Sequence, residues 1–303
     1  MFKQNKNLVF MVRPARFYSN PQTMETNAFQ FPDADQIQVA EKALKEFDAL
    51  VLTLKKSGIS VHVEQDTLER NTPDSIFPNN WISFHEGVVH LYPMCTPNRR
   101  KERSYQYVRN IIADHNIKLK YYRDFSFEEK YARYLEGTGS IVFDHTNMKA
   151  YACLSERMHK DIFLTVCEAL NYFPVFFDAV DGNSKPIYHT NVLLSIGEKF
   201  VVICGESIID NAQKQKIFKD LSKDGKEIFD ITYLQMEQFC GNVLQLESNS
   251  GHKIIVMSST AYHSFTPQQK IMLQEHGQLI HSDVSTIEKN GGGSVRCMIC
   301  EVN

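Results

Sequence analysis

The chain has 303 residues, 43% of them hydrophobic and 23% charged, which is enough for one large domain or two ordinary ones with a sizeable core. A net charge of −3 argues against a nucleic-acid-binding protein, and the one basic run, at 99–103, is expected to be the solvated first turn of a helix. No stretch approaches the roughly 18 apolar residues of a membrane span, and the apolar patch near the N-terminus is too short for a signal peptide.

The cysteines favour a reducing, cytoplasmic location. There are seven, an odd number at irregular positions. Cys297 and Cys300 have the spacing of a Cys-x-x-Cys motif, but they fall in a predicted strand, where alternation turns their side chains to opposite faces. A disulfide or a zinc site is therefore not expected there, and one reactive thiol among buried cysteines is.

Strands and helices are predicted in a regular order along the chain. A strand at 7–14 is followed by a helix at 35–58, which Gly58 ends. Apolar runs on either side of a polar turn then predict β-hairpins at 81–93, 140–154, 191–206 and 242–259. Helical patterns follow these hairpins from residues 98, 155, 211 and 266, and a last strand begins at Cys297.

The hairpins recur at an almost constant spacing. The residues at which they and the last strand begin are Asn80, Glu136, His189, Asn242 and Cys297, separated by 56, 53, 53 and 55 residues. A period near 54 indicates repeated units, each a hairpin plus a helix. The last unit is split, with the strand at 7–14 completing the strand at the C-terminus. The pattern predicts a ring of strands inside helices, in one α/β domain covering 1–303.

Three of the five repeat-start residues are chemically reactive types. Taken alone, each has a more common structural role: a cysteine in a strand is usually a small buried hydrophobic residue, a histidine usually makes a structural hydrogen bond, and a glutamate is usually solvated. Together, Cys297, His189 and Glu136 would lie around one axis of the ring. A histidine can convert a thiol to the attacking thiolate and shuttle protons, and a carboxylate can bind the N–H groups of a planar, nitrogen-rich substrate.

Three motifs resemble those of a known superfamily. "LEGTGS" at 135–140, "HTN" at 189–191 and "GGGSVRC" at 291–297 resemble the Glu, His and Cys motifs of the guanidino-group-modifying, or pentein, superfamily. The resemblance runs from "MVRP" at 11–14 to the end, and with "TPDSIFPNNWISFH" at 72–85 it is closest to the citrulline-hydrolase (CtlX-type) branch. It implies a five-bladed, pseudo-symmetric ββαβ propeller.

The resemblance also implies roles for individual residues. Cys297 would be the nucleophile, His189 the general acid and base, and Glu136 the residue that holds the planar head group. Asp74 would contact the α-amine of the substrate and Arg157 its α-carboxylate, although Arg157 also fits a surface charge at a helix start. Residues 25–30, "ETNAFQ", are expected in a lid loop.

Two asparagines point to the kind of head group. Arginine deiminases have aspartates at the positions of Asn80 and Asn191, and a guanidinium requires such anions. A ureido group is neutral and has a carbonyl acceptor, so an amide suits it better. This favours citrulline, although Asn80 could also serve only to cap a local turn.

The expected reaction is hydrolysis of citrulline to ornithine, carbon dioxide and ammonia through a thiocarbamoyl-type enzyme, with no metal and no organic cofactor. The expected partner is a small amino acid, and the sequence allows a homodimer. Three alternatives stay open: a guanidine hydrolase such as arginine deiminase or dimethylarginine dimethylaminohydrolase, an amidinotransferase, and a catalytically silent pentein that only binds.

Overall fold

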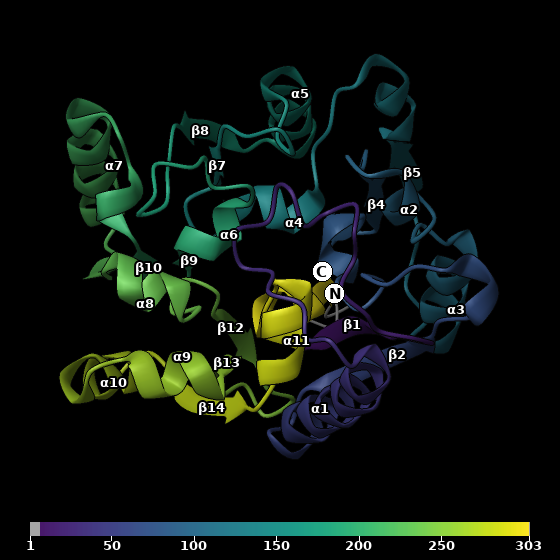
Figure 1. Ribbon diagram of the computed structural model, residues 1–303. Helices are drawn as coiled ribbons and strands as arrows, with labels where there is room; N and C mark the ends of the chain where they lie inside the picture. The colour runs from purple at the N-terminus through teal and green to yellow at the C-terminus, as the bar shows by residue number, and fades with distance from the viewer. Residues whose placement is uncertain (1–6, 303) are drawn as a thin grey trace.

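The computed structural model describes residues 7–302 as a mixed α/β fold built from five three-stranded units with one pairing pattern (Figure 1). In each unit the middle strand is antiparallel to one neighbour and parallel to the other. The units, in chain order of their middle strands, are β15 (Cys300–Val302), β1 (Leu8–Arg13) and β2 (Ser60–Gln65); β3 (Ile82–His85), β4 (Val88–Leu91) and β5 (Tyr121–Asp124); β6 (Val142–Asp144), β7 (Lys149–Cys153) and β8 (Phe173–Phe177); β9 (Leu194–Ile196), β10 (Phe200–Ile203) and β11 (Glu227–Asp230); β12 (Leu244–Glu247), β13 (Lys253–Ser258) and β14 (Gln278–Ser282).

Helices connect the two parallel strands of each unit, because parallel neighbours need a long crossover. Figure 1 shows the main crossover helices at the periphery of the molecule. In unit order the crossovers contain α1 (Gln36–Lys56); α2 (Pro97–Arg100) and α3 (Tyr105–Asp114); α5 (Lys160–Leu170); α7 (Asn211–Lys223); and α9 (Ser259–Ser264) with α10 (Pro267–Gln274). The hairpins predicted from the sequence are confirmed, as is the first helix, which Asp35 caps and after which Gly58 takes a φ of 80°.

One predicted helix is broken in two, and another begins later than the sequence suggested. The helix expected from 98 is broken into α2 and α3, because Ser104 caps a new start by accepting a hydrogen bond from the Tyr107 amide. The helix expected from 155 begins at Lys160, since Ser155 and Met158 first form an isolated bridge. Arg99, within α2, and Arg157, before α5, are both buried.

The unit split between the two ends of the chain is formed as expected. β1 pairs with β15 in antiparallel register, with Leu8 opposite Val302 and Phe10 opposite Cys300. One further pairing, Val302 with Phe84, joins this unit to the next, so that the two make a six-stranded sheet. The strand prediction at Cys297 is wrong in detail, because Cys297 lies in the 3-10 turn η5 (Val295–Met298) and the strand begins at Cys300.

Short helical turns precede most of the inner strands and bring the repeat-start residues together. Asn80 ends η2 (Pro78–Asn80), Glu136 and His189 are the residues before α4 (Gly137–Ser140) and α6 (Thr190–Leu193), and Cys297 lies in η5. These turns contact one another near the centre of Figure 1. The remaining short elements are η1 (Leu68–Arg70), η3 (Ser126–Tyr131), η4 (Gly205–Ser207), α8 (Tyr233–Glu237) and α11 (Ser285–Gly291).

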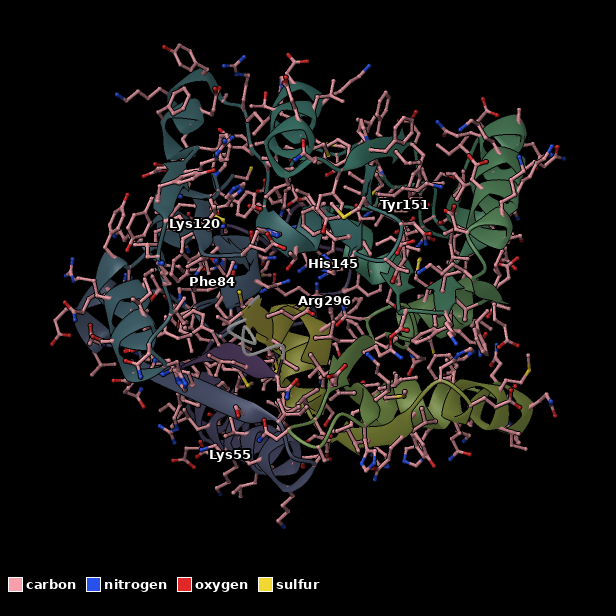
Figure 2. All side chains as sticks on the ribbon, turned by 180° about the vertical axis from the view of Figure 1, so that it is seen from behind. Lys55, Phe84, Lys120, His145, Tyr151 and Arg296 are labelled. Carbon is pink, nitrogen blue, oxygen red and sulfur yellow. The ribbon has the colours of Figure 1, made fainter. Side chains whose placement is uncertain are left out.

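A wide cavity of ≈ 870 Å³ is lined mainly by residues of the hairpins. Figure 2 views the molecule from behind and labels four of the lining residues: Phe84, Lys120, His145 and Arg296. Arg296 and Cys300 line this cavity, whereas Cys297 lines a smaller one. The adjacent residues Arg296 and Cys297 of η5 therefore line two different cavities. Within residues 7–302, no helix combines the length and the apolar character needed to cross a membrane.

Candidate active site

Cys297 is buried in η5, and two asparagine amides contact its sulfur. Its side chain is 5% exposed and lines a small cavity. Asn191 Nδ2 donates to Cys297 Sγ at 3.4 Å, and Asn242 Nδ2 donates at 3.3 Å. Cys300, three residues on, belongs to a different part of the core, where its thiol contacts the Ile82 carbonyl at 3.5 Å. All the cysteines are free, so this pair forms no disulfide.

The three glycines before Cys297 allow close packing around the cavity. Gly292 ends α11 with a φ of 66°, and its carbonyl accepts a hydrogen bond of 2.6 Å from the Tyr188 hydroxyl. A Cβ atom on Gly292 would lie 2.4 Å from Asn27 Nδ2, and one on Gly293 would lie 2.9 Å from the Phe77 ring. The glycine run is thus required by neighbouring protein atoms, and all three glycines line the cavity.

His189 and Glu136 form a buried hydrogen-bonded pair. His189 Nε2 lies 2.8 Å from Glu136 Oε2, and both side chains are almost fully buried. Burial alone would raise the pKa of Glu136, but Arg157, the hydrogen bond from His189 and Arg99 outweigh it and hold that pKa well below its usual range. Burial lowers the pKa of His189 to about 4, although the hydrogen bond to Glu136 acts in the opposite direction.

These pKa shifts indicate the protonation states of Glu136 and His189 near neutral pH. The Glu136 carboxylate is ionised and can only accept, so neutral His189 carries its proton on Nε2. Nδ1 is then the basic nitrogen of a ring that lines the same cavity as Cys297. The arrangement provides a base next to a thiol and a carboxylate that stabilises the base once it is protonated.

Three of the other predicted site residues line the cavity. Asp74, Asn80 and Arg157 line the cavity with Cys297 and His189, whereas Glu136 and Asn191 are not among the described residues that line it. Arg157 is 2% exposed, which excludes the surface-charge interpretation. Its guanidinium lies 3.5 Å from Glu136, donates to the Thr26 hydroxyl at 2.6 Å and stacks over the Tyr188 ring.

Sequence reasoning missed Arg99 and Glu102. Both belong to the basic run expected to be solvated, and that expectation is wrong, because each is 2% exposed. Arg99 pairs with Glu102 through contacts of 2.8 and 3.0 Å and donates to Asn80 Oδ1 at 2.9 Å. Burial raises the pKa of Glu102 to about 7 against the pull of Arg99. No signal in the run itself separates these two residues from their solvated neighbours.

The cavity is small and is covered by the segment that follows β1. Its volume is ≈ 20 Å³, close to that occupied by a single water molecule. The covering segment is purple in Figure 1. Side-chain hydrogen bonds hold it to the rim of the cavity. Asn20 donates to Asp74 at 2.6 Å, Gln30 donates to the Asn290 carbonyl at 2.9 Å and Thr26 accepts from Arg157. Residues 25–30, predicted in a lid loop, lie in this segment.

Several polar atoms at the site have no hydrogen-bond partner among residues 7–302. They are Asp74 Oδ1, Asn80 Nδ2, Arg157 Nε and Asn191 Oδ1. Buried polar atoms are normally hydrogen-bonded, so these atoms are available to a polar ligand. Among residues 7–302 there is no cluster of three or more His, Cys, Asp or Glu side chains arranged to hold a metal ion.

Comparisons with known proteins identify the family of the chain. The family model for eukaryotic N,N dimethylarginine dimethylhydrolases matches residues 13–303. The chain belongs to this family, which places it among the guanidino-group-modifying hydrolases of the pentein superfamily. No curated protein matches the chain in a sequence search.

Solved structures show the same fold at low sequence identity. The product-bound N-terminal domain of ArgZ, a cyanobacterial arginine dihydrolase, is 17% identical with a TM-score of 0.75, and the match covers 98% of this chain and 97% of that one. The apo ArgZ structure is 16% identical with a TM-score of 0.74, and the chain spans 40% of its length. A mutant dimethylarginine hydrolase (DDAH) of Pseudomonas aeruginosa, complexed with citrulline, is 14% identical with a TM-score of 0.65, covering 97% of this chain and 98% of that one.

Gly139 gives a direct test of the site's close packing. A Cβ at this position would lie 2.3 Å from Asn80 Nδ2 and 2.9 Å from the His189 ring. We expect Gly139→Ala to displace one of these side chains, to destabilise the protein by about 1–3 kcal/mol and to lower turnover by about 100-fold, since small misplacements have large catalytic costs. Denaturant unfolding and steady-state kinetics measure the two effects.

Gly182→Ala is the matched control, because its new Cβ would meet only ordinary contacts at 3.9 Å. Equal activity in the two variants would contradict the close-approach role of Gly139.

Proposed function

We propose that the protein hydrolyses a ureido amino acid, most specifically citrulline, through a covalent intermediate on Cys297. The main support for the proposal is the Asn80 side chain, whose amide has a fixed orientation and an NH₂ group without a hydrogen-bond partner among the described residues. Arg99 only donates, so its bond to Asn80 Oδ1 fixes the orientation of the amide. Asn80 Nδ2 is then a buried donor with no partner at the edge of the cavity. Its complement is an acceptor, which a ureido carbonyl supplies and a guanidinium lacks.

The charges around Glu136 support a neutral head group. Arg157 and Arg99 lie 3.5 and 3.7 Å from Glu136 Oε2, and His189 occupies the same oxygen. The other oxygen accepts the Cys95 amide at 3.0 Å. A guanidinium substrate would bring a third cation to a carboxylate that already faces two. A ureido group adds no charge and avoids that repulsion.

The first chemical step is attack of Cys297 on the ureido carbon. His189 takes the thiol proton on Nδ1, and the resulting imidazolium is stabilised by Glu136. The thiolate adds to the carbon, and the C–N bond to the ornithine side chain breaks as the imidazolium returns its proton to the departing amine. The enzyme is left as a thiocarbamoyl ester on Cys297.

The second step is hydrolysis. Water adds to the thiocarbamoyl carbon while His189 accepts a proton, and the C–S bond breaks to regenerate the thiol. The released carbamic acid separates into carbon dioxide and ammonia. Citrulline and one water thus give ornithine, carbon dioxide and ammonia, with no change in oxidation state and no cofactor.

The α-substituents of the substrate have complementary partners in the same cavity. Asp74 Oδ1 is an acceptor without a partner and suits an α-ammonium group, and Arg157 Nε is a donor without a partner and suits an α-carboxylate. Because the cavity holds about one water, an amino acid can bind only after the segment containing Asn20, Thr26 and Gln30 moves. The contacts of that segment to Asp74 and Arg157 would be exchanged for contacts to the substrate.

Hydrolysis of a guanidino compound is the second candidate. The family model is that of dimethylarginine hydrolases, and the solved relatives include arginine dihydrolases. A transferase would require an added amine acceptor such as glycine or ornithine for product formation. A silent binding protein would show no turnover at all, although Cys297, His189 and Glu136 are together in this chain.

We also propose that the five units are the blades of one closed propeller, that residues 1–303 form a single catalytic domain and that it works in a reducing cytoplasm. Support comes from the shared pairing pattern, the junction of β1 with β15 and the free cysteines.

The pH dependence of turnover tests the role of His189. The reaction needs neutral His189, whose pKa lies at about 4, so activity is present above that pKa and is lost as the pH falls through it. We expect kcat/KM for citrulline to stay level from pH 7 to about 5 and to fall near pH 4. Circular dichroism at each pH separates this loss from acid unfolding. An acid limb centred near 6.5, the ordinary value, would contradict the assigned environment.

A substrate panel with an Asn80 variant tests the head group. Citrulline, arginine, dimethylarginine and agmatine are compared for turnover, with and without added glycine. We expect citrulline to be preferred, and Asn80→Asp to lower kcat/KM for citrulline by about 10-fold or more while raising the arginine-to-citrulline ratio, because a donor is replaced by an anion.

Asn79→Asp is the matched control, since Asn79 is equally buried but does not line the cavity. It should leave the ratio between the substrates unchanged. Rapid turnover of arginine by the wild type with none of citrulline would overturn the ureido preference.

A further inference from the structure

Asn242 precedes the unit of β12, β13 and β14, at the position where other units carry Glu136, His189 and Cys297. The reaction proposed above gives it no role. It is 1% exposed and makes four contacts through its side chain. Oδ1 accepts the Arg296 backbone amide at 3.1 Å and lies 3.8 Å from Cys297 Sγ. Nδ2 donates to the Asn191 carbonyl at 2.9 Å and to Cys297 Sγ at 3.3 Å.

The orientation of this amide is fixed by its backbone partners. The Arg296 amide can only donate, so it requires an oxygen, and the Asn191 carbonyl can only accept, so it requires the NH₂ group. Exchanging Oδ1 and Nδ2 would break both bonds. The NH₂ group therefore faces Cys297 Sγ, and the sulfur is the acceptor in that contact.

The donors on the sulfur are neutral amides. Asn191 Nδ2 adds a second donor at 3.4 Å, and among the described residues His189 makes no hydrogen bond to the sulfur. His189 is engaged with Glu136 and, with its pKa at about 4, is uncharged near neutral pH. The hydrogen-bond donors that face the sulfur are therefore the N–H groups of Asn191 and Asn242, and not an imidazolium.

We propose that Asn242 is a positioning residue that, with Asn191, stabilises the Cys297 thiolate and holds its sulfur in place for attack. When the thiol proton passes to His189, the negative charge left on the sulfur is met by the two N–H groups. Hydrogen bonds to the charged form of a group favour that form. This inference rests on the proposed function of Cys297 as the nucleophile, and it adds residues that act on the sulfur without touching the substrate.

Two substitutions of Asn242 separate this role from a purely structural one. Asn242→Asp keeps an oxygen for the Arg296 amide, and so keeps η5 in place, but it removes the donor and puts an anion beside the sulfur. Asn242→Ala removes both. Because the aspartate variant also adds a charge, the alanine variant shows the loss of the donor alone. A purely structural role would lower its alkylation rate at every pH, whereas loss of the donor moves its pH profile.

The measurement is the alkylation rate of Cys297 by iodoacetamide without substrate, followed by peptide mass spectrometry so that the other cysteines are counted separately. We expect both variants to alkylate at least about 10-fold more slowly at pH 7, and the pH of half-maximal rate to move up by about one unit or more. At high pH, where every thiol is ionised, the rates should converge. Turnover should show a lower kcat with KM almost unchanged, since Asn242 does not line the cavity.

Wild-type alkylation at pH 7 and a wild-type pH profile in Asn242→Asp would overturn the inference. If that variant does not fold, Asn191→Asp replaces it, because the Asn191 side chain makes no other hydrogen bond in the described chain. The two proposals can fail separately. If the variants alkylate more slowly but the wild type turns over no ureido or guanidino compound, this inference is supported and the proposed function is refuted. Normal turnover with unchanged alkylation in the variants would refute this inference alone.

Discussion

The centre of the protein depends on one buried carboxylate, Glu136, and on the groups that satisfy its charge. Its side chain is fully buried, and a lone carboxylate there would be strongly destabilising. Two arginines, a histidine and the Cys95 amide surround it. These partners come from three different repeat units, so one charge both joins the units at the axis and fixes the base of the proposed reaction. Gly137 and Gly139 make this possible, because they let α4 approach the backbone of Asn79 and the ring of His189.

The same charges limit what the cavity can accept. Each carboxylate near it has an arginine neighbour, with Arg99 close to Asp74 and Glu102, and Arg157 close to Glu136. The atoms without partners include the Asn80 NH₂ group, an Asp74 oxygen and the Arg157 Nε. A zwitterionic amino acid with a neutral, carbonyl-bearing head group matches this set in charge and in hydrogen bonding. The proposed preference for a ureido substrate therefore rests on how the protein neutralises its own buried ions.

Apolar runs around polar turns were enough to predict the hairpins, and the repeat spacing was enough to predict the split unit and the meeting of Asn80, Glu136, His189 and Cys297. These features can be recognised in one sequence, because they depend on local patterns of apolar and turn residues. Arg99 and Glu102 were missed because their burial results from a break between α2 and α3 that the helical pattern does not reveal. The sequence also does not reveal that the glycines at 291–293 make room for Phe77 and Asn27. Contacts of this kind depend on tertiary structure and leave no local signal.

The proposed reaction depends on a covalent bond between Cys297 and the carbon of the substrate head group. The direct measurement is peptide mass spectrometry after the protein is mixed with citrulline and quenched in acid within the first turnovers, when the thioester-like adduct is at its highest level. We predict one carbamoyl group on the peptide containing Cys297, located on that residue by fragmentation, with Cys300 and Cys95 unmodified. Turnover of citrulline by the Cys297→Ala variant at the wild-type rate, or a carbamoyl group found on Cys300 instead, would contradict the account.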